Sequence, residues 1–413
     1  MNIWLLKTGE PLPSNKNNGR LLRMGMIANE LNNRGHKVIW FTSSFDHFTK
    51  KQICEKDTIE KINENYIIDI SYAKGYKKNI SVSRMLNHRT IAKKFREKAK
   101  KLEKPDLIYV AFPTIDYASE AVKYGKKYNV PVIVDIRDLW PDIFKHNLPK
   151  YLRIFASPYI KLMDYKTRRI MKNAFAINAN SEAVLEWGLK KGKRKKNKFD
   201  RFFYIGYKRE NSNSNPSKKN ILKKDKFNIS FFATINNQFD YDKIAELAKK
   251  LEKTDNDIVV NICGDGPKMD ILKEKTMGLS NINLLGWTER DDLKYILENS
   301  KMGLAPYKNT FDFQIGVSNK FAEYIAYGLP VILTSDGYMK KLVEENNCGI
   351  SSKNPDEICK YIMELKNNNS KYEETSKNAR KLYEEKFNAE KIYNDLINYL
   401  EEVEGEMKKW NMG

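Results

Sequence analysis

A glutamate in a short helix that ends at a glycine is the first candidate for chemistry in this sequence. The helix lies in SNKFAEYIAYGLP, residues 318–330, and is followed by the apolar residues 331–333. The glycine and the apolar run predict a short helix that leads directly into a buried strand. Glu323 lies close to the positive charge of the helix N-terminus, so it should stay ionised and accept hydrogen bonds from a diol.

The residues just before this helix are suited to a phosphate. Ile315, Gly316, Val317 and Ser318 place a flexible glycine turn at the helix N-terminus, where main-chain N–H groups lack partners. The same order of glycine, helix and Pro-Val-Ile also occurs in ordinary β-α-β connections. The local pattern therefore fits either interpretation.

A second polar group, DIRDLWPD at residues 135–142, directly follows an apolar strand. Active sites of α/β sheets lie at the carboxyl ends of strands, so Arg137 and Asp138 are candidate catalytic residues. Asp135 is interpreted as a structural acid at the strand end. The alternative is a buried ion pair, with Trp140 filling the core.

The elements that would position these residues form two successive α/β arrays. In the first half, apolar runs predict strands at residues 2–7, 37–41, 106–111, 130–135 and 174–178, with helices at 20–34 and 116–128. In the second half, strands are predicted at residues 227–233, 258–263, 283–285 and 302–305, with helices at 241–251 and 290–299. The fold class is therefore α/β, with two doubly wound parallel sheets.

A long loop follows the first strand and would overhang a ligand at the carboxyl edge of the sheet. This interpretation places Gly19 and Arg20 on the acceptor side of a site, whereas the alternative is an ordinary surface loop.

Domain boundaries follow from a polar segment rich in Asn, Ser, Pro and Lys at residues 211–219. We expect a first domain at residues 1–210, a linker at 211–225, a second domain at 226–385 and a final helical segment at 386–413.

Composition limits the classes of function. The chain has 413 residues, of which 41% are hydrophobic, enough for two cores, and a net charge of +21 that would attract polyanions. The four cysteines have no metal-ligand spacing, so we expect no metal site, no disulfide framework and a reducing cytosol. No run of about 20 uncharged apolar residues is present, so no membrane span is expected.

Two basic segments raise the question of a membrane surface. Residues 143–173 interleave aromatic and aliphatic residues with lysines and arginines, and KKGKRKKNK follows at residues 190–198. An interfacial helix on an anionic membrane has this composition. An amphipathic helix packed on its own domain, with a solvated basic face, fits equally well.

Four motifs in the second half together resemble the family-4 retaining glycosyltransferases of the GT-B fold. They are CGDGP at 263–267, LLGW at 284–287, GLAP at 303–306 and NKFAEYIAYGLPVI at 319–332. The resemblance covers essentially the whole chain and is most specific over residues 255–335. It implies two Rossmann-like domains that face each other across a cleft. DIRDLWPD resembles the first-domain signature of a bacterial branch that builds envelope polysaccharides such as lipopolysaccharide or capsule.

The resemblance assigns roles to individual residues. Glu323 corresponds to the glutamate that holds the ribose hydroxyls, and Trp287 lies beside the nucleobase, near the turn shaped by Gly264 and Gly266. Main-chain amides around the diphosphate and sugar correspond to Gly316, Val317, Ser318 and Asn319. In the family the last helix crosses back to the first domain, whereas the sequence itself also fits a plain packing helix.

The sequence departs from the family pattern at two places. Ile315 replaces a glutamate that would touch the donor sugar, so recognition of that sugar must differ. FFATINNQFD at 231–240 offers the amide of Asn236 where the family often has Arg and Lys against the diphosphate. Lys320 is our substitute cation, because it lies one helical turn before Glu323. Its alternative is a surface lysine of a basic protein.

The activity implied is metal-independent hexosyl or N-acetylhexosaminyl transfer from a nucleotide-sugar, with UDP expected, to a hydroxyl of a polyprenyl-linked saccharide. The nucleotide-sugar is a substrate, and no cofactor is expected. Asp138 would orient the acceptor or take its proton, although in this family the leaving phosphate itself can take it. We expect a cytoplasmic enzyme on the inner face of the cell membrane.

Three rivals stay open. A GT-B-fold nucleotide-sugar epimerase would convert the donor alone, and a nucleotide-binding pseudo-enzyme would fit Ile315 and the missing basic pair. A non-catalytic polyanion-binding protein would use the charge, but no nucleic-acid-binding module is recognisable, so a nucleic-acid partner is not expected.

Overall fold

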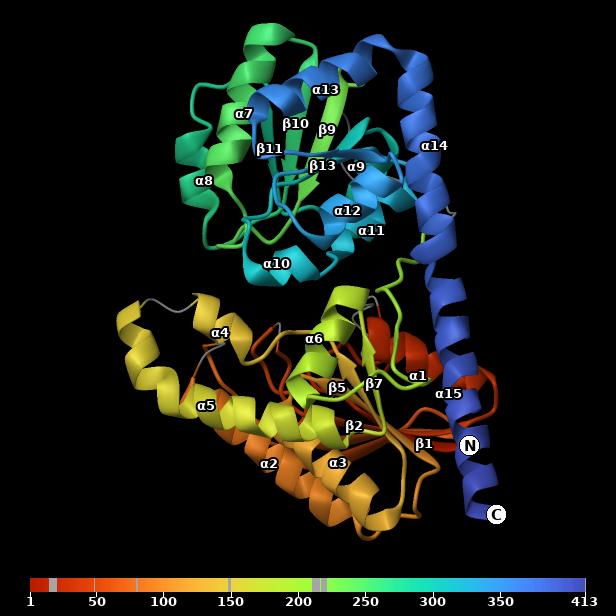
Figure 1. Ribbon diagram of the computed structural model, residues 1–413. Helices are drawn as coiled ribbons and strands as arrows, with labels where there is room; N and C mark the ends of the chain where they lie inside the picture. Colours follow the sequence, from red (N-terminus) through yellow and green to blue (C-terminus); the bar gives the residue numbers. More distant parts are fainter. Residues whose placement is uncertain are drawn as a thin grey trace. The chain divides into compact units, whose positions relative to one another are not determined.

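The chain divides into two compact units. The computed structural model describes residues 1–14, 21–47, 49–78, 81–147, 150–209, 216 and 221–412. Unit 1 comprises Met1–Tyr204 together with Lys391–Gly413, and unit 2 comprises Ile205–Glu390 (Figure 1). Gly19 and Arg20, the acceptor-side candidates, lie outside the described residues.

Unit 1 is built on a mainly parallel sheet. Its described residues form eight strands in the order β3-β4-β2-β1-β5-β6-β7-β8, with only the β3–β4 pair antiparallel. Every residue of β5 and β6 is buried, as expected for a parallel sheet covered on both faces. The strands are β1 Asn2–Leu6, β2 Lys37–Ser43, β3 Thr58–Lys61, β4 Tyr66–Ser71, β5 Leu107–Phe112, β6 Val132–Ile136, β7 Ala176–Ala179 and β8 Arg201–Phe202.

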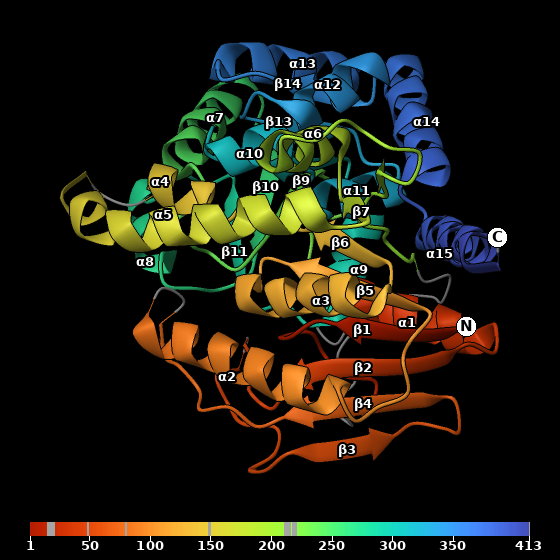
Figure 2. The same cartoon turned by 60° about the horizontal axis from the view of Figure 1, so that its bottom comes forward.

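Helices cover both faces of this sheet. Figure 2 shows α2, α3 and α5 lying in a row on one face of the sheet. Right-handed crossovers between parallel strands place helices on a face in this way. The helices of unit 1 are α1 Arg23–Asn33, α2 Val82–Ala99, α3 Ile115–Tyr128, α4 Asp142–Asn147, α5 Lys150–Asn173, α6 Glu182–Gly192 and the C-terminal α15 Ala389–Met412. Arg34, which caps α1, donates to Asn398 at 2.7 Å and pairs with Glu401 at 3.1 Å, so α15 packs beside α1.

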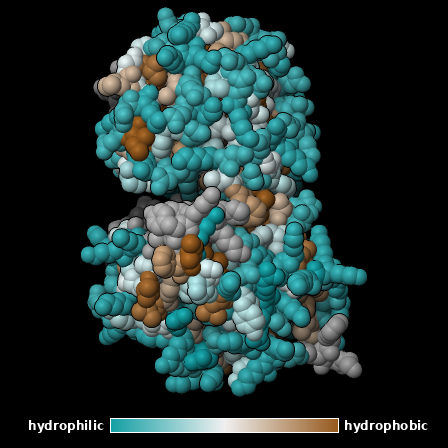
Figure 3. Space-filling model, turned by 60° about the vertical axis from the view of Figure 1, so that its left-hand side comes forward, coloured by the Kyte–Doolittle hydropathy of each residue, from teal (hydrophilic) through white to brown (hydrophobic). Residues whose placement is uncertain are grey.

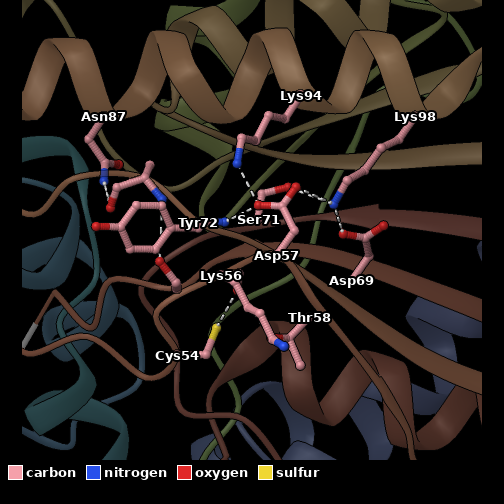
Figure 4. A network of polar contacts seen from close by, with 12 residues as sticks. Cys54, Lys56, Asp57, Thr58, Asp69, Ser71, Tyr72, Asn87, Lys94 and Lys98 are labelled. Atoms are coloured by element: carbon pink, nitrogen blue, oxygen red, sulfur yellow. Dashed lines mark hydrogen bonds and ion pairs between the residues drawn. The ribbon is translucent and has the colours of Figure 1, made fainter.

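A network of ion pairs holds α2 over the edge of the sheet (Figure 4). Lys98 Nζ lies 2.5 Å from Asp69 Oδ1 on β4 and 3.1 Å from Ser71 Oγ. Lys94 Nζ lies 2.5 Å from Asp57 Oδ1, which also accepts the N–H of Tyr72 at 2.8 Å. The C-terminal half of α2 is thus fixed to β4, and its N-terminal half extends to the carboxyl edge of the strands.

Unit 2 contains a second, fully parallel sheet. Its described strands follow the order β11-β10-β9-β12-β13-β14. They are β9 Phe227–Phe232, β10 Ile258–Cys263, β11 Ile282–Gly286, β12 Met302–Ala305, β13 Val331–Leu333 and β14 Gly349–Ser351. The helices are α7 Tyr241–Thr254, α8 Met269–Lys275, α9 Arg290–Glu298, α10 Phe311–Ile315, α11 Asn319–Ala326, α12 Tyr338–Glu345, α13 Pro355–Asn367 and α14 Asn369–Lys386.

The predicted α/β class with two doubly wound sheets is confirmed. The helix predicted at 20–34 spans only Arg23–Asn33, because Leu22 still has extended backbone. The segment between residues 44 and 105 had no predicted elements, yet it contains β3, β4 and α2. Within the described residues, no helix is both long enough and apolar enough to cross a membrane.

We expect Lys98→Met to lower the free energy of unfolding of unit 1 by about 1–3 kcal/mol, because it leaves a buried carboxylate without its cation. Burial already raises the pKa of Asp69, and Lys98 opposes that rise. Urea unfolding can be followed by tryptophan fluorescence, since all six tryptophans except Trp287 belong to unit 1.

The matched control is Lys93→Met on the same helix, where the lysine is 68% exposed. Its effect should stay within about 0.5 kcal/mol. Equal effects of the two variants would contradict an anchoring role for Lys98.

Candidate active site

The loop between α10 and α11 presents main-chain N–H groups at the start of a helix. Gly316 closes α10 by donating its N–H to the carbonyl of Asp312 at 3.0 Å. Ser318 caps α11, and its Oγ accepts the N–H of Phe321 at 3.3 Å. The N–H groups of Asn319 and Lys320 belong to the first helical turn, which has no intrahelical acceptors. Gly316, Val317 and Ser318 of the expected anion site thus lead directly into these two donors.

The neighbouring helix α12 fixes the shape of this loop. The backbone before α12 approaches α10 so closely that a Cβ on Gly337, whose φ is 112°, would lie 2.2 Å from the carbonyl oxygen of Gln314. The N–H of Ser318 lies 3.5 Å from the sulfur of Met339. The loop is therefore held by packing on α12 as well as by its own cap.

Lys320 and Glu323 lie one turn apart on α11, and both are half-buried. The ammonium of Lys320 lies 5.6 Å from the ring centroid of Phe232 and 5.2 Å from that of Phe239. Burial lowers the pKa of Lys320, and the nearby charge of Glu323 opposes this shift. A cation held over two aromatic rings beside a carboxylate is a partly desolvated group and not a solvated surface lysine.

A glycine turn joins the carboxyl ends of three strands in unit 2. Gly264 has a φ of 129°, and a Cβ there would lie 1.8 Å from the carbonyl oxygen of Ala233, after β9. A Cβ on Gly266 would lie 2.4 Å from the oxygen of Ile235. The N–H of Gly264 donates to the carbonyl of Gly286, at the end of β11, at 2.6 Å. Both glycines are thus required by close approach of backbone to backbone.

Asn236 and Trp287 each come directly after a residue of this glycine turn or of its contacts. Asn236 comes directly after Ile235 and is half-buried, and its side-chain oxygen accepts the N–H of Gln238 at 2.9 Å. Trp287 comes directly after Gly286, is 68% exposed and donates from Nε1 to Glu289 at 2.9 Å. The turns after β9, β10 and β11, which carry the predicted residues Asn236, Gly264, Gly266 and Trp287, therefore lie at the carboxyl edge of one sheet. Figure 1 shows α10 and α11 in the same unit.

In unit 1, Asp135 and Arg137 belong to a buried ion network. Asp135 Oδ2 lies 3.1 Å from Nε of Arg23 and 2.8 Å from Nε of Arg137. Arg137 also pairs with Glu10, whose other oxygen accepts the N–H of Met24 at 2.9 Å. Burial alone would raise the pKa of Asp135, but Arg23 and Arg137 outweigh it and hold the pKa at about 2. Arg137 thus lies in the buried ion pair that the sequence offered as the alternative to a catalytic role, and its side chain is only 14% exposed.

Asp138 differs from Asp135, because it is exposed. Its charge acts on Lys7, which follows β1, and on Arg84 of α2. Burial lowers the pKa of Lys7 to about 8, with Glu10 and Asp138 opposing the shift. Asp138 is therefore the exposed acid of DIRDLWPD, and its charge acts on two cations, Lys7 and Arg84.

Two further residues of that segment, Trp140 and Asp142, have packing roles. Trp140 lies against Phe144 with ring centroids 4.6 Å apart. Asp142 accepts from Trp187 Nε1 at 2.9 Å and pairs with Lys191 at 2.9 Å, which ties the start of α4 to α6.

Sequence reasoning missed Lys7, Glu10, Arg23 and Arg84. Lys7 directly follows the first strand, a position that could have been flagged. No local sequence pattern marked Arg23 and Glu10, because their partners are distant in sequence. Among the described residues, no cluster of three or more His, Cys, Asp or Glu side chains could hold a metal ion.

Two family models match the chain. The model of glycosyl transferases group 1 matches residues 213–382, and that of glycosyltransferase family 4 matches residues 23–197. No curated protein sequence matches the chain.

Solved structures resemble the chain along nearly its whole length. Anabaena HepE in complex with UDP has a TM-score of 0.64 at 14% identity, with 97% of this chain and 100% of that chain covered. Sucrose-phosphate synthase from Thermosynechococcus elongatus has a TM-score of 0.71 at 12% identity, with 97% and 98% covered. WaaG, a glycosyltransferase involved in lipopolysaccharide biosynthesis, has a TM-score of 0.57 at 14% identity, with 93% and 95% covered. These likenesses confirm the predicted GT-B fold.

We expect Asp135→Asn to destabilise unit 1 by about 3–5 kcal/mol at pH 7, because it leaves two buried guanidinium groups without their shared carboxylate. The pKa of Asp135 is about 2 in the folded chain, against about 4 in an unfolded one. Its stabilisation is therefore complete above about pH 4 and is lost as the pH falls toward 2.

Urea unfolding at several pH values tests this, since the difference between wild type and variant should shrink below pH 4. The exposed Asp138→Asn is the matched control for stability and should cost less than about 0.5 kcal/mol. A pH-independent difference for Asp135→Asn would contradict the ion network.

Proposed function

We propose that this chain, which belongs to the family-4 glycosyltransferases of the GT-B fold, transfers a sugar from a UDP-linked donor to a hydroxyl of a lipid-linked saccharide. The configuration at the anomeric carbon would be retained. The observation that carries the proposal is the arrangement of Lys320, Glu323 and the first-turn N–H groups at the start of α11.

Unit 2 would bind the donor. The carboxylate of Glu323 would accept hydrogen bonds from the two ribose hydroxyls. The exposed ring of Trp287 would offer a flat apolar surface to the nucleobase. UDP is the expected nucleotide, and the UDP complex of the structural neighbour HepE supports this choice.

The same helix end would stabilise the leaving group. When the bond from the anomeric carbon to the phosphate oxygen breaks, negative charge develops on the diphosphate. The N–H groups of Asn319 and Lys320, and the Lys320 ammonium, would accept this charge in place of a metal ion. Partial burial of Lys320 strengthens this effect, because a partly desolvated cation interacts more strongly than one in water.

Unit 1 would bind the acceptor. Asp138 would orient the acceptor hydroxyl, whose oxygen forms the new bond to the anomeric carbon, and the proton would pass to the departing phosphate oxygen. Arg137 would act by positioning, through its ion pairs with Asp135 and Glu10. Ile315 replaces the family's sugar-binding glutamate, so the sugar specificity of the donor must come from other groups.

A lipid-linked acceptor would place the enzyme on the cytoplasmic face of a membrane. Four large apolar residues on α5 are exposed, namely Ile154, Phe155, Leu162 and Tyr165. Figure 3 shows apolar side chains gathered on one face of unit 1, beside hydrophilic groups. The lipopolysaccharide role of the structural neighbour WaaG supports a part in bacterial envelope polysaccharide synthesis.

The nucleotide-sugar epimerase is the enzymatic rival. An epimerase converts the donor with no acceptor present, whereas the proposed transferase requires the acceptor for turnover. Incubation with UDP-sugars alone, followed by analysis of the sugar released, separates the two. A thermal-shift panel of UDP-, GDP- and dTDP-sugars identifies the nucleotide, because bound ligand raises the melting temperature.

We expect Glu323→Gln to weaken UDP binding by roughly 10–100-fold, because hydrogen bonds to a charged acceptor contribute about 1.5–3 kcal/mol. Lys320→Met should instead lower kcat by roughly 100-fold or more, because its charge is needed most as the leaving group departs. Titration calorimetry and steady-state kinetics measure the two effects.

Glu344→Gln is the matched control in the same unit, since this glutamate is 58% exposed and only pairs with Lys340. It should bind UDP like the wild type. Unchanged UDP affinity in Glu323→Gln would refute the assignment of the ribose site.

We expect the chain to float with anionic liposomes and to stay behind with neutral ones, because basic side chains add about 1 kcal/mol each near an anionic surface. Replacing Ile154 and Phe155 by serine should reduce flotation severalfold. Equal recovery with both lipid compositions would remove the membrane part of the proposal.

A further inference from the structure

A small apolar cavity lies within unit 1, between α2, α4 and α5. Its volume is about 90 Å³, and its apolar wall includes Met85, Ala156, Ile160 and Met163. The volume is about three times the share of one molecule in liquid water, enough for a few methylene groups. The cavity does not overlap the donor residues, all of which belong to unit 2.

One charged residue of the cavity wall, Arg84, belongs to a group of cations. Its guanidinium lies 4.8 Å from the ring centroid of Trp140 and 5.6 Å from that of Tyr76, so aromatic rings hold it in place. Its charge acts on Lys7 and Lys50. Lys7 has a pKa of about 8, so it is mostly protonated at neutral pH.

The histidines beside Arg84 do not add to this charge. Burial, with Arg84 as the next cause, lowers the pKa of His88 to about 3 and that of His47 to about 4. Both imidazoles are thus neutral at pH 7. Glu10, Asp138 and Asp46 offset part of the charge of the four cations Arg84, Lys7, Lys50 and Arg137, which leaves a net positive group next to an apolar cavity.

The apolar character continues from the cavity wall to the surface. On α2, Val82 lies three residues before the wall residue Met85, and on α5, Phe155 lies four residues before the wall residue Tyr159. Residues with these spacings are neighbours on a helix surface, and Val82 and Phe155 are 68% and 83% exposed. A hydrocarbon chain that leaves the cavity would therefore meet further apolar side chains.

We propose that this cavity and Arg84 bind a lipid diphosphate, with the first carbons of its chain in the cavity and its phosphates against Arg84 and Lys7. The ligand would be the lipid-linked acceptor itself, so the inference rests on the proposed function. A guanidinium binds phosphate oxygens through paired hydrogen bonds, and an adjacent lysine adds a second charge. The other end of the same ligand, the sugar, would extend toward Asp138, whose charge already acts on Lys7 and Arg84.

Farnesyl diphosphate and inorganic pyrophosphate serve as probes, titrated into the full chain by calorimetry. The cavity should make farnesyl diphosphate bind at least tenfold more tightly than pyrophosphate, because only the former buries carbon. Equal affinities, or no binding of farnesyl diphosphate, would overturn the proposal without any variant.

Two variants then separate the apolar and charged parts. Ala156→Leu fills the cavity and should weaken farnesyl diphosphate by about tenfold while leaving pyrophosphate unchanged. Its control, Ser157→Leu, enlarges the side chain at the next position of α5 by a similar amount. This variant should bind both probes like the wild type. Arg84→Gln should weaken both probes by at least tenfold, whereas Lys93→Gln on the same helix should change neither by more than twofold.

Thermal unfolding checks that each variant is folded, and titration with UDP tests the donor site separately. Binding of farnesyl diphosphate without UDP would sink the proposed function and leave this site standing. Binding of UDP without farnesyl diphosphate would sink only this site. Unchanged affinity for farnesyl diphosphate in both Ala156→Leu and Arg84→Gln would assign its binding to another surface.

Discussion

Lys320 holds its ammonium over the rings of Phe232 and Phe239, one helical turn from the carboxylate of Glu323. Burial disfavours the charged lysine, and the carboxylate opposes that effect. This pair forms where α11 begins near the carboxyl edge of the sheet, because β9 ends in Phe232, the loop after β9 carries Phe239, and Ser318 caps the helix. The donor site that we propose depends on this pairing of a helix end with a half-buried cation.

The two units use the same edge of a parallel sheet in different ways. In unit 2, close backbone contacts at Gly264 and Gly266 leave side chains and N–H groups of the edge available to a ligand. In unit 1, the corresponding edge is partly filled by the network of Arg23, Asp135 and Arg137, which stabilises the fold. The charges of the exposed Asp138 and of Arg84 act on Lys7, as do those of Glu10 and Arg137, and we propose these groups for the acceptor.

The sequence predicted unit 2 better than unit 1. Long apolar runs and glycine motifs marked the strands of unit 2 and the position of Glu323. Between residues 44 and 105 such signals are weak, because α2 carries charged residues on most of its surface and β3 is largely exposed. The pairing of Arg23 with Asp135 joins residues 112 positions apart, which no local pattern shows. Arg137 was therefore open to a catalytic or a structural interpretation until its ion pairs were seen.

A crystal structure of the chain with UDP tests the central claim most directly. The account predicts both ribose hydroxyls within hydrogen-bonding distance of the Glu323 carboxylate. It also predicts the diphosphate against the N–H groups of Asn319 and Lys320, with the Lys320 ammonium nearby. A nucleotide bound elsewhere, or a diphosphate that makes no contact with the start of α11, would contradict it.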